Sequence, residues 1–259
     1  MGILKHVSQV ALNSVFPPRC AGCDAWEEGL FCEDCRLQLR AIEAPLCAVC
    51  GKPFDPLAFA SLCAECRPSR NNKPPEFSAL RSCFMFEGPS REAIHRYKYE
   101  GQSSLAGLLA QELSGFWRSD CNGTLQIPPC DLMAPVPLHW WRAYRRGYNQ
   151  SELLANQLSP MIDVPSKVLL HRVKPTRPQV ELGRDQRAEN VKNAFQVDKE
   201  MTPVIKEKTI LLIDDVCTTG ATLRECARAL RKGGAAAIYA ITFARQIPQQ
   251  TSLENNAVA

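Results

Sequence analysis

The sequence predicts an α/β protein, with a central, mostly parallel sheet flanked by helices and a small N-terminal domain rich in cysteine. Three observations lead to this prediction. Strand-like and helix-like segments alternate between residues 80 and 245. The apolar run from Ile210 to Ile213 has no polar face, which is typical of a strand covered on both sides. Eight of the 13 cysteines lie within the first 66 residues.

The elements of the α/β part are expected in a definite order. Strands are indicated by short runs of apolar residues, and helices by apolar residues three and four positions apart. Leu223, Cys226, Ala227 and Leu230 show this helical spacing, and Gly233-Gly234 would end their helix. The expected order is strand 79–88, helix 89–101, helix 104–119, strand 130–138, helix 149–162, strand 167–175, central strand 209–214, helix 222–234 and closing strand 235–245.

Composition divides the 259 residues into five parts. The first segment has apolar residues on one helical face and ends in Pro17-Pro18. A stretch rich in Pro, Asn and charge separates the cysteines from the α/β part. The predicted parts are an amphipathic helix at 1–18, a double zinc ribbon at 19–70, a linker at 71–79, the α/β domain at 80–245 and a flexible polar tail at 246–259.

The net charge of +4 is unevenly distributed. Between residues 139 and 195 there are ten Lys/Arg and five Asp/Glu, so about a fifth of the chain holds the whole basic excess. That pattern indicates a polyanionic partner or a phosphate-rich substrate, and a solvated basic face is the alternative. Polar residues interrupt the first segment, and no stretch approaches the roughly 20 apolar residues of a membrane span. We therefore expect a cytoplasmic protein without a membrane span, its cysteines reduced or bound to metal.

The N-terminal cysteines form four C-x-x-C pairs, and each pair can place two thiolates on one tight turn. The spacing favours two local four-thiolate zinc sites over an interleaved arrangement. A disulfide framework would need an export signal, and a thioredoxin-type dithiol would need one pair in a βαβ unit. We expect structural zinc, with docking of a partner or nucleic acid as a further role. The two predicted sites are Cys20, Cys23, Cys32 and Cys35, and Cys47, Cys50, Cys63 and Cys66.

The stretch ILLIDDVCTTGATL, residues 210–223, predicts an anion site. Its polar loop follows a buried strand and opens a helix, so backbone amides can converge on a phosphate at the carboxyl edge of the sheet. Asp214 and Asp215, just before the loop, can hold the vicinal hydroxyls of a sugar, directly or through Mg²⁺. A phosphorylated ribose satisfies both halves. Two acids that merely end a strand and cap a helix are the alternative.

These residues resemble the ribose-phosphate signature of type I phosphoribosyltransferases. The resemblance implies that fold, with phosphoribosyl pyrophosphate and Mg²⁺ as ligands. By resemblance, Asp214 and Asp215 would contact ribose, and the loop would wrap the 5′-phosphate. Thr218 stands where purine-salvage members often have an aspartate, which disfavours a base-specific salvage reaction. The implied loop residues are Thr218, Thr219, Gly220, Ala221 and Thr222.

A narrower resemblance covers nearly the whole chain. The segments 95–110, 134–155 and 172–195, together with the N-terminal cysteines, look like hallmarks of the ComF family, which is linked to competence and DNA uptake. Within the last of these segments, the order R-P-Q…R…R…N-V, residues 177–191, also resembles the flexible loop of glutamine amidophosphoribosyltransferases. Those enzymes need a glutaminase domain with an N-terminal cysteine, and this chain starts with MGILKH, so their complete reaction is excluded.

The basic middle segment has two interpretations. Its arginines can neutralise a pyrophosphate bound beside the turn Pro135–Pro137. With neighbouring aromatic residues they also resemble a platform for single-stranded nucleic acid, although such aromatics often simply pack in the core. The arginines are Arg142, Arg145, Arg146, Arg184 and Arg187, and the aromatics are Trp140, Trp141, Tyr144 and Tyr148.

Three functional hypotheses follow. The first is a ComF-like protein that binds phosphoribosyl pyrophosphate and handles single-stranded DNA with the DNA-uptake machinery as a partner. The second is an active phosphoribosyltransferase that makes a nucleotide or glycosylamine. The third is a binding-only sensor of the metabolite. The sequence identifies neither a catalytic base nor an acceptor.

Overall fold

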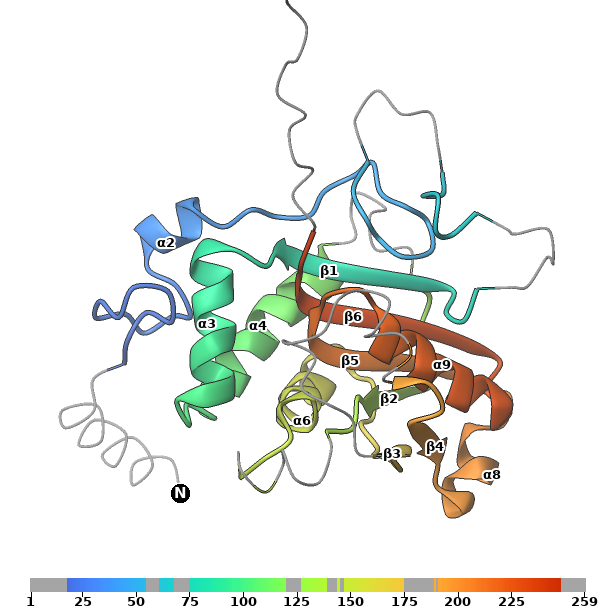
Figure 1. The fold of residues 1–259 in the computed structure, drawn as a ribbon. Coiled ribbons are helices and arrows are strands. Elements are labelled where there is room, and N and C mark those ends of the chain that lie inside the picture. The colour runs from blue at the N-terminus through green and yellow to red at the C-terminus, as the bar shows by residue number, and fades with distance from the viewer. Residues whose placement is uncertain are drawn as a thin grey trace, which may run out of the picture.

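Four parallel strands form the central sheet of the computed structural model (Figure 1). The structure describes residues 18–54, 61–67, 75–119, 127–138, 144, 147–174, 189 and 191–247. In the order of the sheet, the strands are β1 (Ala79–Met85), β6 (Ala237–Arg245), β5 (Thr209–Cys217) and β2 (Leu132–Pro135). The predicted central strand β5 pairs with β6 and β2, which confirms its inner position. β6 is the last strand in the sequence, yet it lies between β1 and β5 and pairs in parallel with both.

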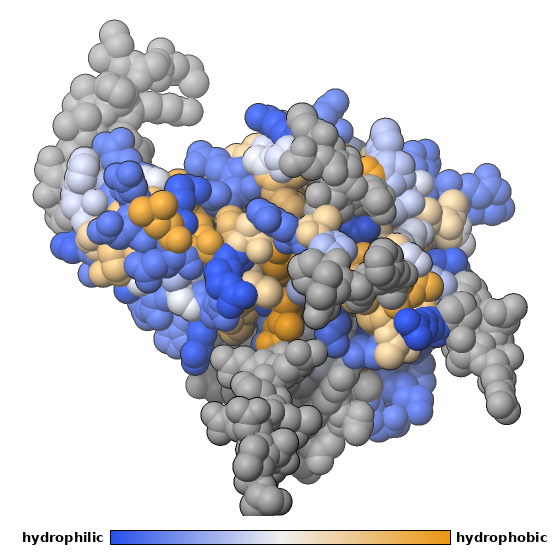
Figure 2. All heavy atoms as spheres, turned by 90° about the horizontal axis from the view of Figure 1, so that it is seen from above, coloured by the Kyte–Doolittle hydropathy of each residue, from blue (hydrophilic) through white to orange (hydrophobic). Residues whose placement is uncertain are grey.

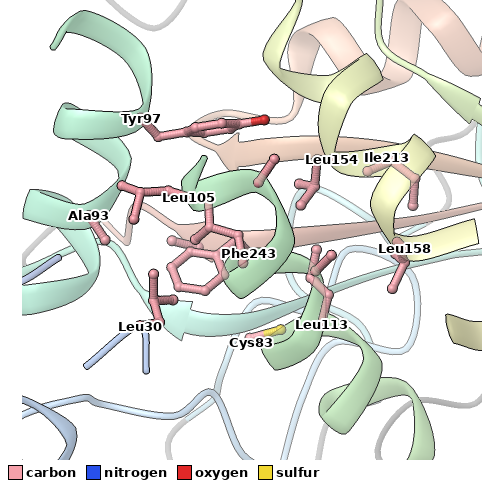
Figure 3. Close-up of a cluster of buried hydrophobic side chains, with 14 of the residues drawn as sticks. Leu30, Cys83, Ala93, Tyr97, Leu105, Leu113, Leu154, Leu158, Ile213 and Phe243 are labelled. Atoms are coloured by element: carbon pink, nitrogen blue, oxygen red, sulfur yellow. The ribbon is translucent and has the colours of Figure 1, made fainter. Parts of the chain in front are cut away.

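Helices cover both faces of this sheet (Figure 1). Strand alternation sends Leu211 and Ile213 to one face and Ile210 and Leu212 to the other. The first face packs against three helices, as the apolar cluster in Figure 3 shows. These helices are α3 (Gly88–Tyr99), α4 (Leu105–Arg118) and α6 (Gln150–Ile162). The second face packs against the apolar stripe of α9 (Ala221–Lys232), so the helix expected at 222–234 is confirmed.

One predicted strand lies outside the central sheet. The segment expected at 167–175 forms only β3 (Leu170–Arg172), which pairs antiparallel with β4 (Phe195–Val197) in a separate two-stranded sheet. No strand was expected at β4, because three residues are too few to show a periodicity. The short helices η3 (Lys199–Met201) and α8 (Thr202–Ile205) then lead into β5.

The N-terminal cysteine segment lies against the outer strand β1 and the helix α3 (Figure 1). Its short helix α2 (Glu33–Leu37) contains Cys35. The amide of Ile42 donates to the carbonyl of Cys83 at 2.9 Å, and that of Met85 donates to Arg40 at 2.8 Å. The segment therefore covers the free edge of the sheet, which would otherwise expose unpaired backbone groups.

The surface mixes polar residues with smaller apolar patches, as the view from above shows (Figure 2). Among the described residues, no helix is both long and apolar enough to cross a membrane. The amphipathic helix expected at 1–18 and the polar tail at 246–259 lie almost wholly outside the described residues.

Candidate functional site

The two adjacent acids at the end of β5 have different environments. Asp215 is 4% exposed, and its Oδ1 lies 2.8 Å from Nζ of Lys98 on α3. Asp214 is half-buried, and its Oδ1 accepts hydrogen bonds from Oγ of Ser151 at 2.9 Å and from the amide of Asp215 at 3.0 Å. Successive strand residues point to opposite faces, which separates the two carboxylates. Asp214 is thus the acid that retains exposed surface.

The carboxyl of Asp214 has a raised pKa. Burial is the largest cause and the neighbouring Asp215 carboxylate adds to it, whereas Lys98 and Ser151 act in the opposite direction. The net effect raises the pKa of Asp214 to about 7 from an ordinary 3.8. A carboxyl that titrates near neutral pH is a common feature of binding and catalytic sites.

The loop after β5 has the form that the sequence predicts. It spans Thr218 to Gly220 and ends at Ala221, the first residue of α9, with Gly220 as N-cap at a φ of 75°. That left-handed conformation favours glycine. Oγ1 of Thr219 accepts from the amide of Ala221 at 3.3 Å. The loop therefore leads directly into the N-terminus of a 12-residue helix, where the helix dipole favours an anion.

Arg224, which was not predicted from the sequence as a site residue, forms a hydrogen bond with this loop. Nη1 of Arg224, on the first turn of α9, donates to the carbonyl of Thr219 at 2.9 Å. Lys98 and Ser151 were missed in the same way, although each lies within a segment that resembles the ComF family. In the sequence Lys98 is one of two basic residues in the last turn of α3, with Arg96, and only its contact with Asp215 of β5 sets it apart.

Two tyrosines fix the helices that supply Lys98 and Ser151. The hydroxyl of Tyr97 donates to the carbonyl of Gln150 at 2.7 Å, and that of Tyr148 donates to the carbonyl of Tyr97. The two rings lie 6.0 Å apart. Tyr148 therefore packs against the core, as the alternative to a stacking platform supposed, whereas Tyr144 is 78% exposed.

The predicted pyrophosphate or nucleic-acid residues lie outside the described residues, so their roles remain predictions. They are Arg142, Arg145, Arg146, Arg184 and Arg187, together with Trp140 and Trp141. The turn before them is described: the carbonyl of Val136 accepts from Nδ2 of Asn149, the N-cap of α6, at 3.3 Å. That contact brings the carboxyl end of β2 to the N-terminus of α6.

The eight N-terminal cysteines gather in two groups of four, local rather than interleaved. Within each group the Sγ atoms lie within 4.8 Å of one another. All the described cysteines are free of disulfide bonds. The groups are Cys20, Cys23, Cys32 and Cys35, and Cys47, Cys50, Cys63 and Cys66.

The chemistry of both groups fits zinc. Backbone amides donate to sulfur in each: Cys32 to Sγ of Cys20 at 3.3 Å, and Cys63 to Sγ of Cys47 at 3.4 Å. Burial acts to raise the pKa of Cys20, but amide donors led by Cys32 outweigh it and bring it to about 7. In the second group, hydrogen bonds with Cys47 and Cys50 raise the pKa of Cys66. Four close thiols cannot all ionise unaided, and a divalent cation relieves that conflict.

Comparison with known proteins identifies both parts of the chain. A family described as "Double zinc ribbon domain" matches residues 11–67, and one described as "Phosphoribosyl transferase domain" matches residues 146–258. Together with the parallel sheet and its flanking helices, these matches confirm the predicted phosphoribosyltransferase fold with an N-terminal zinc-ribbon domain. Glutamine phosphoribosylpyrophosphate amidotransferase of Bacillus subtilis is structurally similar at 18% identity, with 55% of this chain and 26% of that chain covered, but its TM-score of 0.33 is too low to bear on function.

Relatives that align over most of their length show the family to which the chain belongs. "Competence protein F" of Haemophilus influenzae is 34% identical over 217 residues, covering 83% of this chain and 90% of the relative. "DNA utilization protein YhgH" of Salmonella typhimurium is 31% identical, covering 83% of this chain and 97% of the relative. "Competence protein ComFC" of Bacillus subtilis is 28% identical, covering 83% of each chain. The chain belongs to the ComF family of competence proteins.

Proposed function

We propose that this protein binds phosphoribosyl pyrophosphate and handles single-stranded DNA during its uptake or utilisation. The observation that supports ligand binding most strongly is the partly exposed Asp214, which lies near the end of β5, just ahead of the loop that leads into α9. In this proposal Asp214 accepts hydrogen bonds from the ribose hydroxyls, and Asp215 with Lys98 keeps that end of β5 in place. The loop residues Thr218–Thr222 receive the 5′-phosphate.

The pyrophosphate group is proposed to meet the turn after β2 and the arginines around it. Mg²⁺ is commonly held by substrate phosphates and one or two carboxylates, so the pyrophosphate and the carboxylate of Asp214 would hold it here. Its role is to neutralise the charge of the bound phosphates. The partly exposed carboxylate of Asp214 offers an oxygen ligand of the kind that Mg²⁺ binds.

Titration calorimetry with phosphoribosyl pyrophosphate, with and without Mg²⁺, tests ligand binding. Asp214→Asn is expected to weaken binding by about tenfold or more, because hydrogen bonds to a charged acceptor are lost. Asp131→Asn is the matched control: it removes one carboxylate that pairs with Lys208 at the opposite end of the sheet. No binding by the unmodified protein would refute the proposal.

The DNA role is supported by the names of the relatives, competence and DNA utilization proteins, and by the basic excess of residues 139–195. Cations can follow the phosphate backbone while exposed aromatic residues stack on bases. We propose that the protein acts in the cytoplasm, where thiol-rich zinc sites remain reduced. The DNA-uptake machinery is the proposed partner.

Fluorescence anisotropy with a single-stranded oligonucleotide tests DNA binding over a range of salt concentrations. Arg145→Ala/Arg146→Ala is expected to weaken binding. It should also reduce the slope of log binding constant against log salt concentration by the amount that corresponds to about two lost phosphate contacts. Lys206→Ala/Lys208→Ala, which removes the same charge from an exposed segment beside β5, is the control. Equal effects of the two double variants would argue for a nonspecific charge effect.

A phosphoribosyl transfer reaction is a second candidate, favoured by the near-neutral pKa of Asp214. In such a reaction the bond from C1′ to pyrophosphate breaks, a bond to the acceptor forms, and the acceptor gives up a proton. Asp214 is a carboxyl suited to accept a proton at neutral pH. Pyrophosphate release on addition of acceptor pools would distinguish transfer from binding alone, because a sensor releases none.

A further inference from the structure

The turn between Cys47 and Cys50 is bound to the central sheet through three successive carbonyls. Two of the donors are buried arginines, one on β1 and one on β6, and the third is a backbone amide of β1. The hydrogen bonds are Arg81 Nη2 to Ala48 at 3.1 Å, Leu80 N to Val49 at 2.7 Å, and Arg245 Nη1 to Cys50 at 2.5 Å. This metal-binding turn is therefore part of the sheet's packing rather than a separate appendage.

The next residue makes the approach closer still. Gly51 has a φ of 65°, and a Cβ there would lie 2.2 Å from the carbonyl oxygen of Leu80. Only glycine allows the turn to lie so close to β1. The second cysteine group and the sheet edge are thus fixed to each other at the level of the backbone.

Arg245 connects this turn to the loop between β5 and α9, Thr218–Gly220, which is called the phosphate loop below. It is the last residue of β6 and stands in register with Cys217, the last residue of β5. The amide of Gln246 donates to the carbonyl of Cys217 at 2.9 Å, and Thr218 begins the loop at the next position. A shift of Arg245 would therefore be transmitted directly to the origin of the loop.

Arg245 is 5% exposed, so its charge needs compensation. Among the described residues it forms no salt bridge with a carboxylate, and its hydrogen bond goes to the carbonyl of a cysteine in the metal-binding group. Four thiolates around one Zn²⁺ leave a net charge of about −2. That cluster would place negative charge at the turn whose Cys50 carbonyl accepts the hydrogen bond from Arg245.

We propose that the second zinc site positions the phosphate loop through Arg245. The guanidinium of Arg245 donates to the carbonyl of Cys50, and a thiolate–zinc cluster at that turn would supply the negative charge that keeps it there. Arg245 would in turn hold the paired ends of β5 and β6, where the loop begins. This inference rests on the proposed binding of a phosphorylated ribose. The first zinc site differs, because it contacts helices: Arg96 of α3 donates to the carbonyl of Cys20 at 3.3 Å.

Calorimetry with ribose 5-phosphate tests the inference, because this probe occupies the phosphate loop without pyrophosphate. Arg245→Met is expected to weaken its binding about tenfold, the effect of losing one charge-assisted hydrogen bond. Arg36→Met is the matched control: it removes an arginine that pairs with Glu112 at 2.6 Å and ties the first ribbon to α4. The affinity of Arg36→Met for ribose 5-phosphate should equal that of the unmodified protein. The zinc content should remain about two per chain in both variants.

Cys66→Ser provides an independent test if Arg245→Met fails to fold. Cys66 is a partly buried member of the second group, and its loss should lower the zinc content and weaken ribose 5-phosphate binding together. If Arg245→Met, or Cys66→Ser with reduced zinc content, bound ribose 5-phosphate with unchanged affinity, this inference would be overturned and the proposed function would stand. If the unmodified protein does not bind ribose 5-phosphate, the proposed function fails and the inference fails with it.

Discussion

Replacing Lys98 with methionine should destabilise the protein markedly. The substitution keeps most of the side-chain volume and removes the ammonium that lies 2.8 Å from Oδ1 of Asp215. Asp215 is 4% exposed, so its carboxylate would remain buried without this cation. Removal of one partner from a buried ion pair typically costs about 3–5 kcal/mol. Because the Lys98 side chain retains 22% exposure, we expect the lower end, about 3 kcal/mol.

Urea denaturation at pH 7.5 measures this loss, with Lys208→Met as the control. Lys208 also pairs with an aspartate, Asp131, at 2.9 Å, but both side chains are exposed. Its removal should cost less than about 1 kcal/mol. The double variant Lys98→Met/Asp215→Asn should be more stable than Lys98→Met, because no charge is then left unpaired. If the two lysine variants were equally stable, the ion pair would not anchor Asp215, and the reasoning would be refuted.

Three further predictions concern the acid, the close backbone contact and the metal. Burial raises the pKa of Asp214 to about 7 in the folded state, so its contribution to stability falls as pH rises from about 4 to 7 and then stays constant. Thermal unfolding should therefore show Asp214→Asn up to about 4 kcal/mol more stable than the unmodified, ligand-free protein at pH 8 and no more stable at pH 4. Gly51→Ala should destabilise by more than about 2 kcal/mol, whereas Gly115→Ala, in α4 with open space around its Cβ, should stabilise by about 0.5–1 kcal/mol; a similar effect of both would contradict the contact with Leu80. Metal analysis should give about two zinc per chain, and a strong chelator should lower the unfolding temperature, since metal binding contributes folding free energy.

The local patterns were sufficient to predict most of the elements. Apolar runs predicted β1, β5 and β6, and the spacing of Leu223, Cys226 and Leu230 predicted α9. The C-x-x-C pairs predicted two local four-cysteine groups, which the structure forms. These features depend on residues close together in the chain, so periodicity and spacing are enough to reveal them.

Tertiary structure alone decided how the two adjacent acids differ. In the sequence Asp214 and Asp215 are equivalent carboxylates, but strand alternation and packing against α3 bury Asp215 with Lys98, 117 residues earlier in the chain. The same holds for Arg245, whose hydrogen bond to Cys50 crosses 195 positions. Burial and charge pairing depend on which distant elements meet, and no local pattern contains that information. The sequence by itself determined the pair of acids before a loop and the two groups of cysteines. Only the folded chain determined that Asp215 pairs with Lys98, that Asp214 keeps part of its surface exposed, and that Arg245 on β6 contacts Cys50.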